Sequence, residues 1–291
     1  SPISMRHLLL ALICFNGLAC FLEAADSRPN IVFVITDDQR WDQLGYNGHP
    51  VLKTPNIDRI AREGASFNHF FVATPLCSPS RASLLTGLYP HTHRVFNNDK
   101  LGIDVISHTL MTFPRQLREQ GYETAYIGKW HMGSHNDDPR PGFDHWVSFQ
   151  GQGQYLPTGN TLNVDGKDLP QKGYITTELT DYATDWLETQ RDSDQPFFLY
   201  LSHKAVHANF TPEDKYEDSL ADRPYIRPST EANTDENYAN RPRWLRDQRN
   251  SWHGVDFPYH SSLDVQAYKM RYHRALSAVD DSLGRLFQWL E

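Results

Sequence analysis

Two uninterrupted apolar segments constrain the fold of this chain more than any other feature. They are NIVFVIT at 30–36 and PFFLYLSH at 196–203, both rich in β-branched or aromatic residues. Runs of this kind, without polar alternation, are typical of parallel strands that are buried on both faces. A third candidate strand is YETAYIGKW at 122–130. We therefore expect a central sheet with helices on both sides.

Helical patterns separate these strands. The segment TPNIDRIAREG at 54–64 offers Thr54 as N-cap, a proline in the first turn and a glycine past the end. Residues 211–262, rich in Pro, Asp, Arg and Asn, predict a long surface excursion. Alternating strands and helices predict an α/β sandwich with a mostly parallel sheet. Further helices are expected at 109–121, 178–190 and 264–291.

The bulk composition limits the choice of partners. The 291 residues are 39% hydrophobic and 22% charged, which provides enough apolar material for a sizeable core. The formal net charge is −8 at pH 7. This charge argues against nucleic acid or an anionic membrane as the main partner, but it leaves room for a small anionic substrate in a locally basic cleft.

The N-terminal segment predicts export. In MRHLLLALICFNGLACFLEAA, residues 5–25, Arg6 precedes an apolar stretch that ends in small residues at Ala25. This is the pattern of a secretory signal peptide, and residues 1–4 are expected to be upstream sequence. A membrane anchor is the alternative, but the apolar run is short for a span, so we expect no stable membrane insertion. Without the signal, Cys77 is the single cysteine, and we expect a periplasmic or extracellular protein without an internal disulfide.

Polar residues follow each expected strand. In open parallel sheets, sites form beyond the carboxyl ends of the strands, so these residues are expected to converge on one edge. Cys77 and Arg81, at the start of another expected helix, join them. The residues at the strand ends are Asp37 and Asp38, then Lys129 and His131, and finally His203.

Each of these residues also has a simpler structural interpretation. Asp37 and Asp38 form either a turn that caps a helix or part of a site for a hard cation, which needs about six to eight oxygen ligands when the cation is calcium. Lys129 is either an anion ligand or a solvated strand end. His203 is a hydrogen-bonded core residue or, with His207, half of a metal site. A strand at this position disfavours zinc, because the His-x-x-x-His spacing suits zinc on a helix.

Cys77 lies in PLCSPSRASLLTG at 75–87, directly ahead of a proline and Arg81. A helix N-terminus and a nearby guanidinium would depress the pKa of the thiol and produce a nucleophilic thiolate. A cysteine hydrolase of that kind also needs a histidine base, and no local residue indicates one. The proline at +2, the arginine at +4 and Thr-Gly at +9 and +10 match a different arrangement.

The segment CSPSRASLLTG resembles the signature of the type I sulfatases, in which C-x-P-x-R directs oxidation of the cysteine to formylglycine. The resemblance covers nearly all of residues 29–291, and PLCSPSRASLLTG with YPHTHRVFNN is most similar to the N-acetylglucosamine-6-sulfatase branch, which acts on glycosaminoglycans. The other matching segments are NIVFVITDDQRWDQLG, TPNIDRIAREGASFNHFF, ETAYIGKWHMG, PGFDHWVSFQGQG and FLYLSHKAVHANFTP.

The resemblance implies a fold, a reaction and a set of roles. The fold is an alkaline-phosphatase-like sandwich with a mostly parallel central sheet, and residues 26–291 form the N-terminal part of its catalytic domain. The reaction is hydrolysis of a sulfate ester on a carbohydrate, after a formylglycine-generating or sulfatase-maturing enzyme has converted Cys77. The implied metal is Ca²⁺, bound by Asp37, Asp38 and the hydrated formylglycine.

The remaining roles follow from the same resemblance. Arg81 would hold the formylglycine, and Lys129 would bind the sulfate oxygens. His131 would act as base in the release step, and His203 would bind the sulfate and help to protonate the leaving alcohol. Three residues in family-like stretches are expected to contact substrate, namely His207, His93 and Asn98.

The family pattern extends past Glu291, into an Asp-Asn pair that completes the calcium site, a sulfate-binding lysine and a small C-terminal domain. We therefore expect a truncated chain that is inactive and poorly folded by itself. Two other functions stay open. One is a phosphonate monoesterase or phosphodiesterase that uses the same formylglycine. The other is a non-catalytic glycan-binding relative, against which the intact Cys77, Arg81 and Lys129 argue.

Overall fold

The computed structural model describes residues 28–98, 103–192, 194–226, 235–248 and 262–291. The predicted signal peptide lies outside the described residues, and so does part of the predicted surface excursion at 211–262. Among the described residues, no helix is both long enough and apolar enough to cross a membrane.

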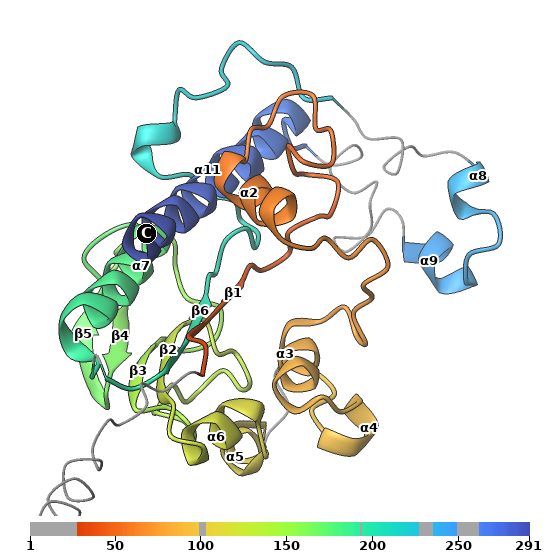
Figure 1. Ribbon diagram of the computed structural model, residues 1–291. Helices are drawn as coiled ribbons and strands as arrows, with labels where there is room; N and C mark the ends of the chain where they lie inside the picture. The colour runs from red at the N-terminus through yellow and green to blue at the C-terminus, as the bar shows by residue number, and fades with distance from the viewer. Residues whose placement is uncertain (1–27, 99–102, 193, 227–234, 249–261) are drawn as a thin grey trace, which may run out of the picture.

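In the part of the chain that the structure describes, a six-stranded sheet forms the centre of the fold, with the strand order β1-β6-β2-β3-β4-β5 (Figure 1). The first four strands in this order are parallel, and the last two pairings are antiparallel. The mostly parallel sheet and the three predicted strands are confirmed. The strands are β1 (Ile31–Ile35), β2 (Glu123–Gly128), β3 (His145–Ser148), β4 (Thr161–Val164), β5 (Lys167–Pro170) and β6 (Phe197–Ser202).

Three of these strands were not predicted from the sequence. They are β3, β4 and β5, each four residues long, and β5 is exposed throughout. Such short segments show neither a long apolar run nor a clear alternation. The expectation that the first strand is buried on both faces is corrected: β1 lies at the edge of the described sheet, and all five of its residues are only half-buried.

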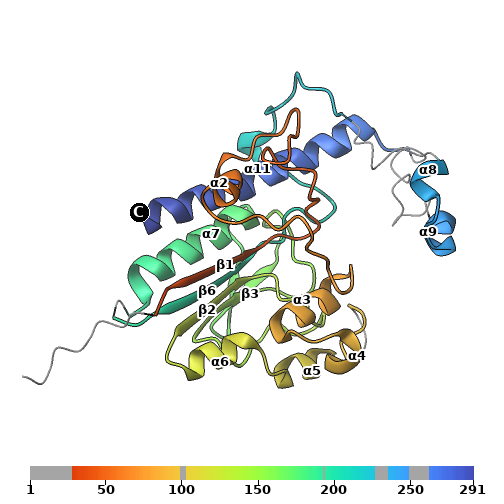
Figure 2. The same cartoon turned by 45° about the vertical axis from the view of Figure 1, so that its right-hand side comes forward.

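Helices cover both faces of the sheet (Figure 2). One face carries α7 (Ile175–Asp185), extended by a π-helical turn at Trp186–Gln190, and α11 (Val265–Leu290), which packs on both α7 and α2 (Pro55–Glu63). The other face carries α3 (Cys77–Thr86), α4 (Pro90–His93), α5 (Ile103–Thr109) and α6 (Phe113–Glu119). Shorter helical segments follow β6, namely η2 (Asp214–Tyr216), α8 (Asp235–Tyr238) and α9 (Arg243–Gln248).

Alternate residues of the strands enter two separate cores. On β6, Phe197, Leu199 and Leu201 belong to the core shared with α7 and α11, whereas Phe198 and Tyr200 belong to the core on the other face. Successive side chains of a strand point to opposite faces, so a run without polar residues supplies both layers at once. This explains why the segment 196–203 is apolar throughout.

The predicted helices are present with shifted ends. The helix predicted at 109–121 starts later, because α5 ends at Thr109 and α6 begins at Phe113 with Pro114 in its first turn. Proline fits a first turn, where its missing N–H is not needed. The helix predicted at 178–190 begins earlier, at Ile175.

Thr54 precedes α2 as predicted, but its side chain does not cap the helix. Its hydroxyl instead donates to Asp58 Oδ1 at 2.7 Å. The first backbone N–H groups of α2 are bound by a residue far away in the sequence: Asn56 N and Ile57 N donate to Asp280 Oδ1 on α11, at 3.1 and 2.9 Å. A carboxylate from α11 therefore performs the capping function expected of a local side chain.

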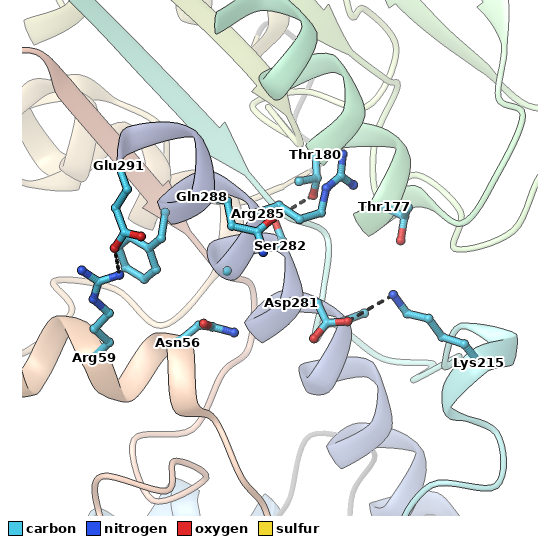
Figure 3. A pocket seen from close by; sticks show the side chains of 13 residues that line it. Asn56, Arg59, Thr177, Thr180, Lys215, Asp281, Ser282, Arg285, Gln288 and Glu291 are labelled. Atoms are coloured by element: carbon cyan, nitrogen blue, oxygen red, sulfur yellow. Dashed lines mark hydrogen bonds and ion pairs between the residues drawn. The ribbon is translucent and has the colours of Figure 1, made fainter. Parts of the chain in front are cut away.

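A second polar connection ties α11 to α7 and to the end of β6. Ser282 Oγ lies 2.7 Å from Thr180 Oγ1 and 3.0 Å from the Nε2 atom of His203. Figure 3 shows Thr180 and Ser282 facing each other beside a pocket where α2, α7 and α11 meet. The ring of His203 is fully buried, and this burial lowers the pKa of His203 to about 4.

The same pocket carries charged residues on its walls. Arg59 of α2 forms an ion pair with Glu291 at 2.6 Å, and Lys215 forms one with Asp281 at 3.2 Å (Figure 3). Its lining includes none of the residues that the sequence predicts for the active site. The pocket is therefore a junction of helices, and the hydrogen bond between Ser282 and His203 is its link to the predicted residues.

The buried His203 predicts loss of stability in acid. Its pKa is about 4 in the folded chain, below the ordinary value of 6.5, so the unfolded chain takes up a proton first as the pH falls. The free energy of unfolding should thus fall by up to about 3 kcal/mol between pH 6.5 and 4 because of this residue. His203→Gln keeps a hydrogen-bonding group toward Ser282 without this titration. Urea unfolding across this pH range should show a shallower decline for the variant.

The matched control is His91→Gln, because His91 lies exposed at the surface. Its unfolding curve should follow that of the wild-type chain at every pH. Parallel declines of the wild-type chain and His203→Gln would contradict the assignment of the acid sensitivity to this ring.

Candidate active site

The ends of three parallel strands are joined by backbone hydrogen bonds at one edge of the sheet. Lys129 N donates to Ser202 O at 2.8 Å, and His203 N donates to Ile35 O at 2.9 Å. Beyond the ends of β1 and β6, the pairing continues, because Asp37 N donates to Ala205 O at 2.9 Å. The segments that follow β1, β2 and β6 are therefore held side by side, as the sequence analysis expected.

Helix α3 adds its first two turns to this edge. It begins at Cys77, whose Sγ lies 3.8 Å from Asp37 Oδ1 and 3.8 Å from Lys129 Nζ. Arg81, one turn later, donates to Asp37 Oδ2 at 3.2 Å, to Ser202 Oγ at 2.7 Å and to the carbonyl oxygen of Lys129. Four of the predicted residues thus form one cluster: Asp37, Cys77, Arg81 and Lys129.

The charges in this cluster depend on each other. Burial by itself would raise the pKa of Asp37, but Lys129 and Arg81 outweigh burial and hold it well below its usual range. The Nζ atom of Lys129 donates to Asp37 Oδ2, and burial lowers the pKa of the Lys129 amine. Asp38 is different, since burial and the neighbouring charge of Asp37 both raise its pKa.

The thiol of Cys77 is not an activated nucleophile in this setting. Burial raises the pKa of Cys77 and outweighs the opposite effect of Lys129, and the charges of Asp37 and Asp38 act in the same direction as burial. The thiolate considered from the helix start and Arg81 is therefore corrected: the two carboxylates and the burial disfavour it. A protonated thiol agrees with a cysteine that is a precursor rather than the reacting group.

His131 belongs to the loop that closes over the first turn of α3. The hydroxyl of Ser78 donates to the carbonyl oxygen of His131, and Ser78 N donates to Asn98 Oδ1 at 3.0 Å. His131 is buried and adopts a left-handed conformation with φ of 44°. His93 is also buried, with its Nε2 3.0 Å from Ser83 Oγ on α3. The predicted contact residues Asn98 and His93 thus hold α3 from two sides.

The structure does not bring His203 into the cluster. Its ring points to Ser282 on α11, within the core between the sheet and α7. The residue that reaches the cluster is His207, whose Nε2 lies 3.8 Å from Asp38 Oδ2. Burial lowers the pKa of His207, and the charge of Lys129 adds to the effect. The expectation that His203 binds the sulfate is therefore corrected, because its ring is directed away from the cluster.

Sequence reasoning missed three residues of the site. Gln152 Oε1 accepts from Lys129 Nζ at 2.5 Å, and Ser202 Oγ both accepts from Arg81 and donates to the carbonyl oxygen of Lys129. Lys204 is buried beside Tyr155. Ser202 and Lys204 flank the end of a predicted strand, which is a usable signal. Gln152 lies in a loop without such a signal.

The residues present fit part of a calcium site. Calcium prefers carboxylate and other oxygen ligands, about six to eight in number. Asp37 and Asp38 supply two carboxylates at the edge, and position 77 adds oxygen only after conversion of the cysteine. Within the described ranges, no three carboxylate, imidazole or thiol groups stand close enough together to hold an ion. The donor type is correct for calcium, and the number of donors is smaller than calcium requires.

Comparison with known proteins identifies relatives of the chain. The sulfatase family model matches residues 29–291. The N-acetylglucosamine-6-O-sulfatase of Bacteroides thetaiotaomicron is 35% identical over 246 residues, covering 83% of this chain and 42% of that protein. The N-acetylgalactosamine-6-sulfatase of Mus musculus is 34% identical over 229 residues, covering 68% of this chain and 43% of that protein. The chain spans less than half of the length of these two relatives.

Solved structures agree with this result. The structure of BT4656 in complex with its substrate D-glucosamine-2-N,6-O-disulfate has a TM-score of 0.75 at 29% identity, covering 91% of this chain and 62% of that chain. The phosphonate monoester hydrolase of Agrobacterium radiobacter shares the fold, with a TM-score of 0.63 at 23% identity over 90% of this chain and 59% of that chain. The alkaline-phosphatase-like fold is confirmed, and the match across residues 29–291 shows that the chain belongs to the sulfatase family.

Proposed function

We propose that this protein is a sulfuric ester hydrolase that removes sulfate from a sulfated carbohydrate. The observation that carries the proposal is the position of Cys77, whose Sγ lies 3.8 Å from both Asp37 Oδ1 and Lys129 Nζ. A reacting group at this position has a carboxylate on one side and a cation on the other. Residues 26–291 are the N-terminal part of the catalytic domain.

The reacting group is formylglycine, made from Cys77 by a formylglycine-generating or sulfatase-maturing enzyme. When hydrated, formylglycine supplies one hydroxyl that attacks sulfur and a second hydroxyl that allows release of the sulfate. The raised pKa of the Cys77 thiol supports a precursor role, because a protonated thiol is a poor nucleophile. A calcium ion held by Asp37, Asp38 and position 77 would stabilise negative charge on the sulfate.

The surrounding side chains orient the reactants and stabilise charge. Arg81 lies one turn after position 77 in α3 and fixes that position. Its hydrogen bond to Asp37, at 3.2 Å, keeps the carboxylate ionised. Lys129 contributes positive charge next to Cys77, where the sulfate would lie. His131 takes the role of base in sulfate release, from the loop that is bonded to the first turn of α3.

His207 takes the role of general acid toward the leaving alcohol. Burial lowers the pKa of His207, so the negative charge of the bound sulfate has to keep the ring protonated. His207 lies at the cluster, 3.8 Å from Asp38, whereas His203 is bonded to Ser282 in the core. Its side chain is partly exposed, with 20% of its surface accessible, so it can reach a substrate. General acid catalysis by a positioned histidine contributes about 10²–10⁴-fold to a rate.

The proposed substrate is a carbohydrate with a 6-O-sulfated glucosamine, of the kind found in glycosaminoglycans. Two relatives support it, the N-acetylglucosamine-6-O-sulfatase of Bacteroides thetaiotaomicron and the structure of BT4656 with D-glucosamine-2-N,6-O-disulfate. A phosphonate monoesterase is the second candidate, supported by the shared fold. It is disfavoured because the bacterial and mouse relatives at 35% and 34% identity are both named as sulfatases.

The proposed function is tested with protein produced from its full coding sequence together with a formylglycine-generating enzyme. Mass spectrometry of the peptide with position 77 should show formylglycine in place of cysteine, and the protein should hydrolyse 6-O-sulfated N-acetylglucosamine. Cys77→Ser should lower this activity about 10³-fold, since a serine lacks the second hydroxyl. Unmodified cysteine in active protein would refute the mechanism. Faster hydrolysis of a phosphonate monoester would favour the second candidate.

The two histidines of the segment after β6 give a paired test of the general acid. His207→Gln should lower kcat about 10²-fold or more on a substrate with a poor leaving group, and less on an aryl sulfate, whose leaving group needs no proton. His203→Gln should retain kcat at neutral pH, since its ring lies in the core. The reverse ranking of the two variants would return the acid role to His203.

We also propose that the protein is exported through the signal peptide at residues 5–25. The apolar segment after Arg6 and the small residues before Asp26 support this proposal. N-terminal sequencing of the native protein from the periplasm or the medium should give a chain that starts at Asp26. A mature protein that still carries Met5 would exclude cleavage at this position.

A further inference from the structure

The loop after β6 carries Lys204, a buried lysine to which the proposed function assigns no role. Lys204 follows the strand by two residues, and its carbonyl oxygen accepts a hydrogen bond from His207 N at 3.0 Å. Only 4% of Lys204 is exposed. Its Nζ atom lies 4.9 Å from the centroid of the Tyr155 ring. The amine is therefore fixed beside the segment that carries His207.

The Nζ atom of Lys204 has no acceptor in the described part of the chain. No oxygen there lies within hydrogen-bond or ion-pair distance of it, and the amine contacts the face of the Tyr155 ring instead. Contact with an aromatic face contributes about 0.5–2 kcal/mol, less than burial of an unpaired cation costs. Burial, with the nearby charge of Lys129, lowers the pKa of Lys204 to about 8, so the amine is still mostly charged at pH 7.

The other cations at this edge are already engaged. An ammonium group has three N–H donors. Those of Lys129 are directed to Asp37, Gln152 and the sulfur of Cys77. Arg81 directs its terminal nitrogens to Asp37, to Ser202 and to the carbonyl oxygen of Lys129. The carboxylate of Asp37 thus accepts hydrogen bonds from two cations, Lys129 and Arg81, and Lys204 is not one of its donors.

We propose that Lys204 binds an oxygen of the sulfate group of the substrate, next to position 77. The inference rests on the proposed function and adds a substrate-binding residue to it. An anionic oxygen would give the three N–H groups of Lys204 the acceptor that they lack, and a charge-assisted hydrogen bond is among the stronger ones. The charges that act on the pKa of the Lys204 amine are those of Lys129, Asp37, Asp38 and Cys77, all of them residues of the candidate site.

Tyr155 gives this arrangement its rigidity. Its ring supports the Lys204 amine, and its hydroxyl donates to the carbonyl oxygen of His207 at 2.7 Å. The ring also stacks on Tyr174, with centroids 5.8 Å apart. One buried side chain therefore sets the positions of both the proposed sulfate ligand and the proposed general acid.

The test is sulfate binding at pH 7 by the protein produced from its full coding sequence. Sodium sulfate replaces sodium chloride at constant ionic strength, and the affinity is measured by isothermal titration calorimetry. Lys204→Met keeps the apolar stem on Tyr155 and removes the charge, so it should weaken sulfate binding about tenfold or more. Lys215→Met is the matched control, since this lysine is half-exposed and paired with Asp281. It should leave the affinity unchanged.

A second variant separates charge from packing. Lys204→Arg keeps the charge and should bind sulfate within about threefold of the wild-type chain. The Tm of Lys204→Met in chloride should be no lower than that of the wild-type chain, because an unpaired buried charge is removed. Equal sulfate affinities of Lys204→Met and the wild-type chain would overturn the proposal, and so would a wild-type chain that binds no sulfate.

This readout is independent of the proposed function, because binding of inorganic sulfate requires neither formylglycine nor turnover. A protein without sulfatase activity that still loses sulfate affinity in Lys204→Met would refute the proposed function alone. Normal sulfatase activity together with unchanged sulfate affinity in Lys204→Met would refute the inference alone.

Discussion

The carboxylate of Asp37 is the interaction on which the site depends. It is buried and accepts from Lys129 and Arg81, which come from the end of β2 and from α3. Neither cation would be stable at this depth without a counter-ion, and the carboxylate would be protonated without the cations. Three distant segments therefore have to meet before any of the three charges is tolerated.

This mutual dependence also positions Cys77. Because Arg81 is anchored one turn after the start of α3, the first residue of that helix is brought to the sheet edge. Ser78 adds two more bonds, to Asn98 and to the carbonyl oxygen of His131. The reacting position is thus held by the charge cluster on one side and by the two hydrogen bonds of Ser78 on the other. Such preorganisation is what electrostatic stabilisation of a transferring group requires.

The sequence predicted that Asp37, Cys77, Arg81 and Lys129 lie together, but it missed Gln152, Ser202 and Lys204 and misplaced His203. The motif at Cys77 and Arg81 is local, and the residues after the strands follow from the rule that parallel strands end at one edge. His203 satisfied the same rule, yet its side chain enters the core under α11. The direction of a side chain in the first residue after a strand depends on strand register and on the polar group it meets. Ser282, a residue 79 positions later, supplies that group.

The sequence by itself determined the alternating strands and helices, the helix start at Cys77 and membership in a family with a recognisable motif. These depend on local patterns, such as apolar runs, proline in a first turn and residue spacing. The tertiary structure alone decided that Asp280 caps α2, that His207 rather than His203 reaches the cluster, and that Lys204 is buried without an acceptor among the described residues. Each of these depends on contacts between segments far apart in the chain, and the energies of buried polar groups are set by such partners.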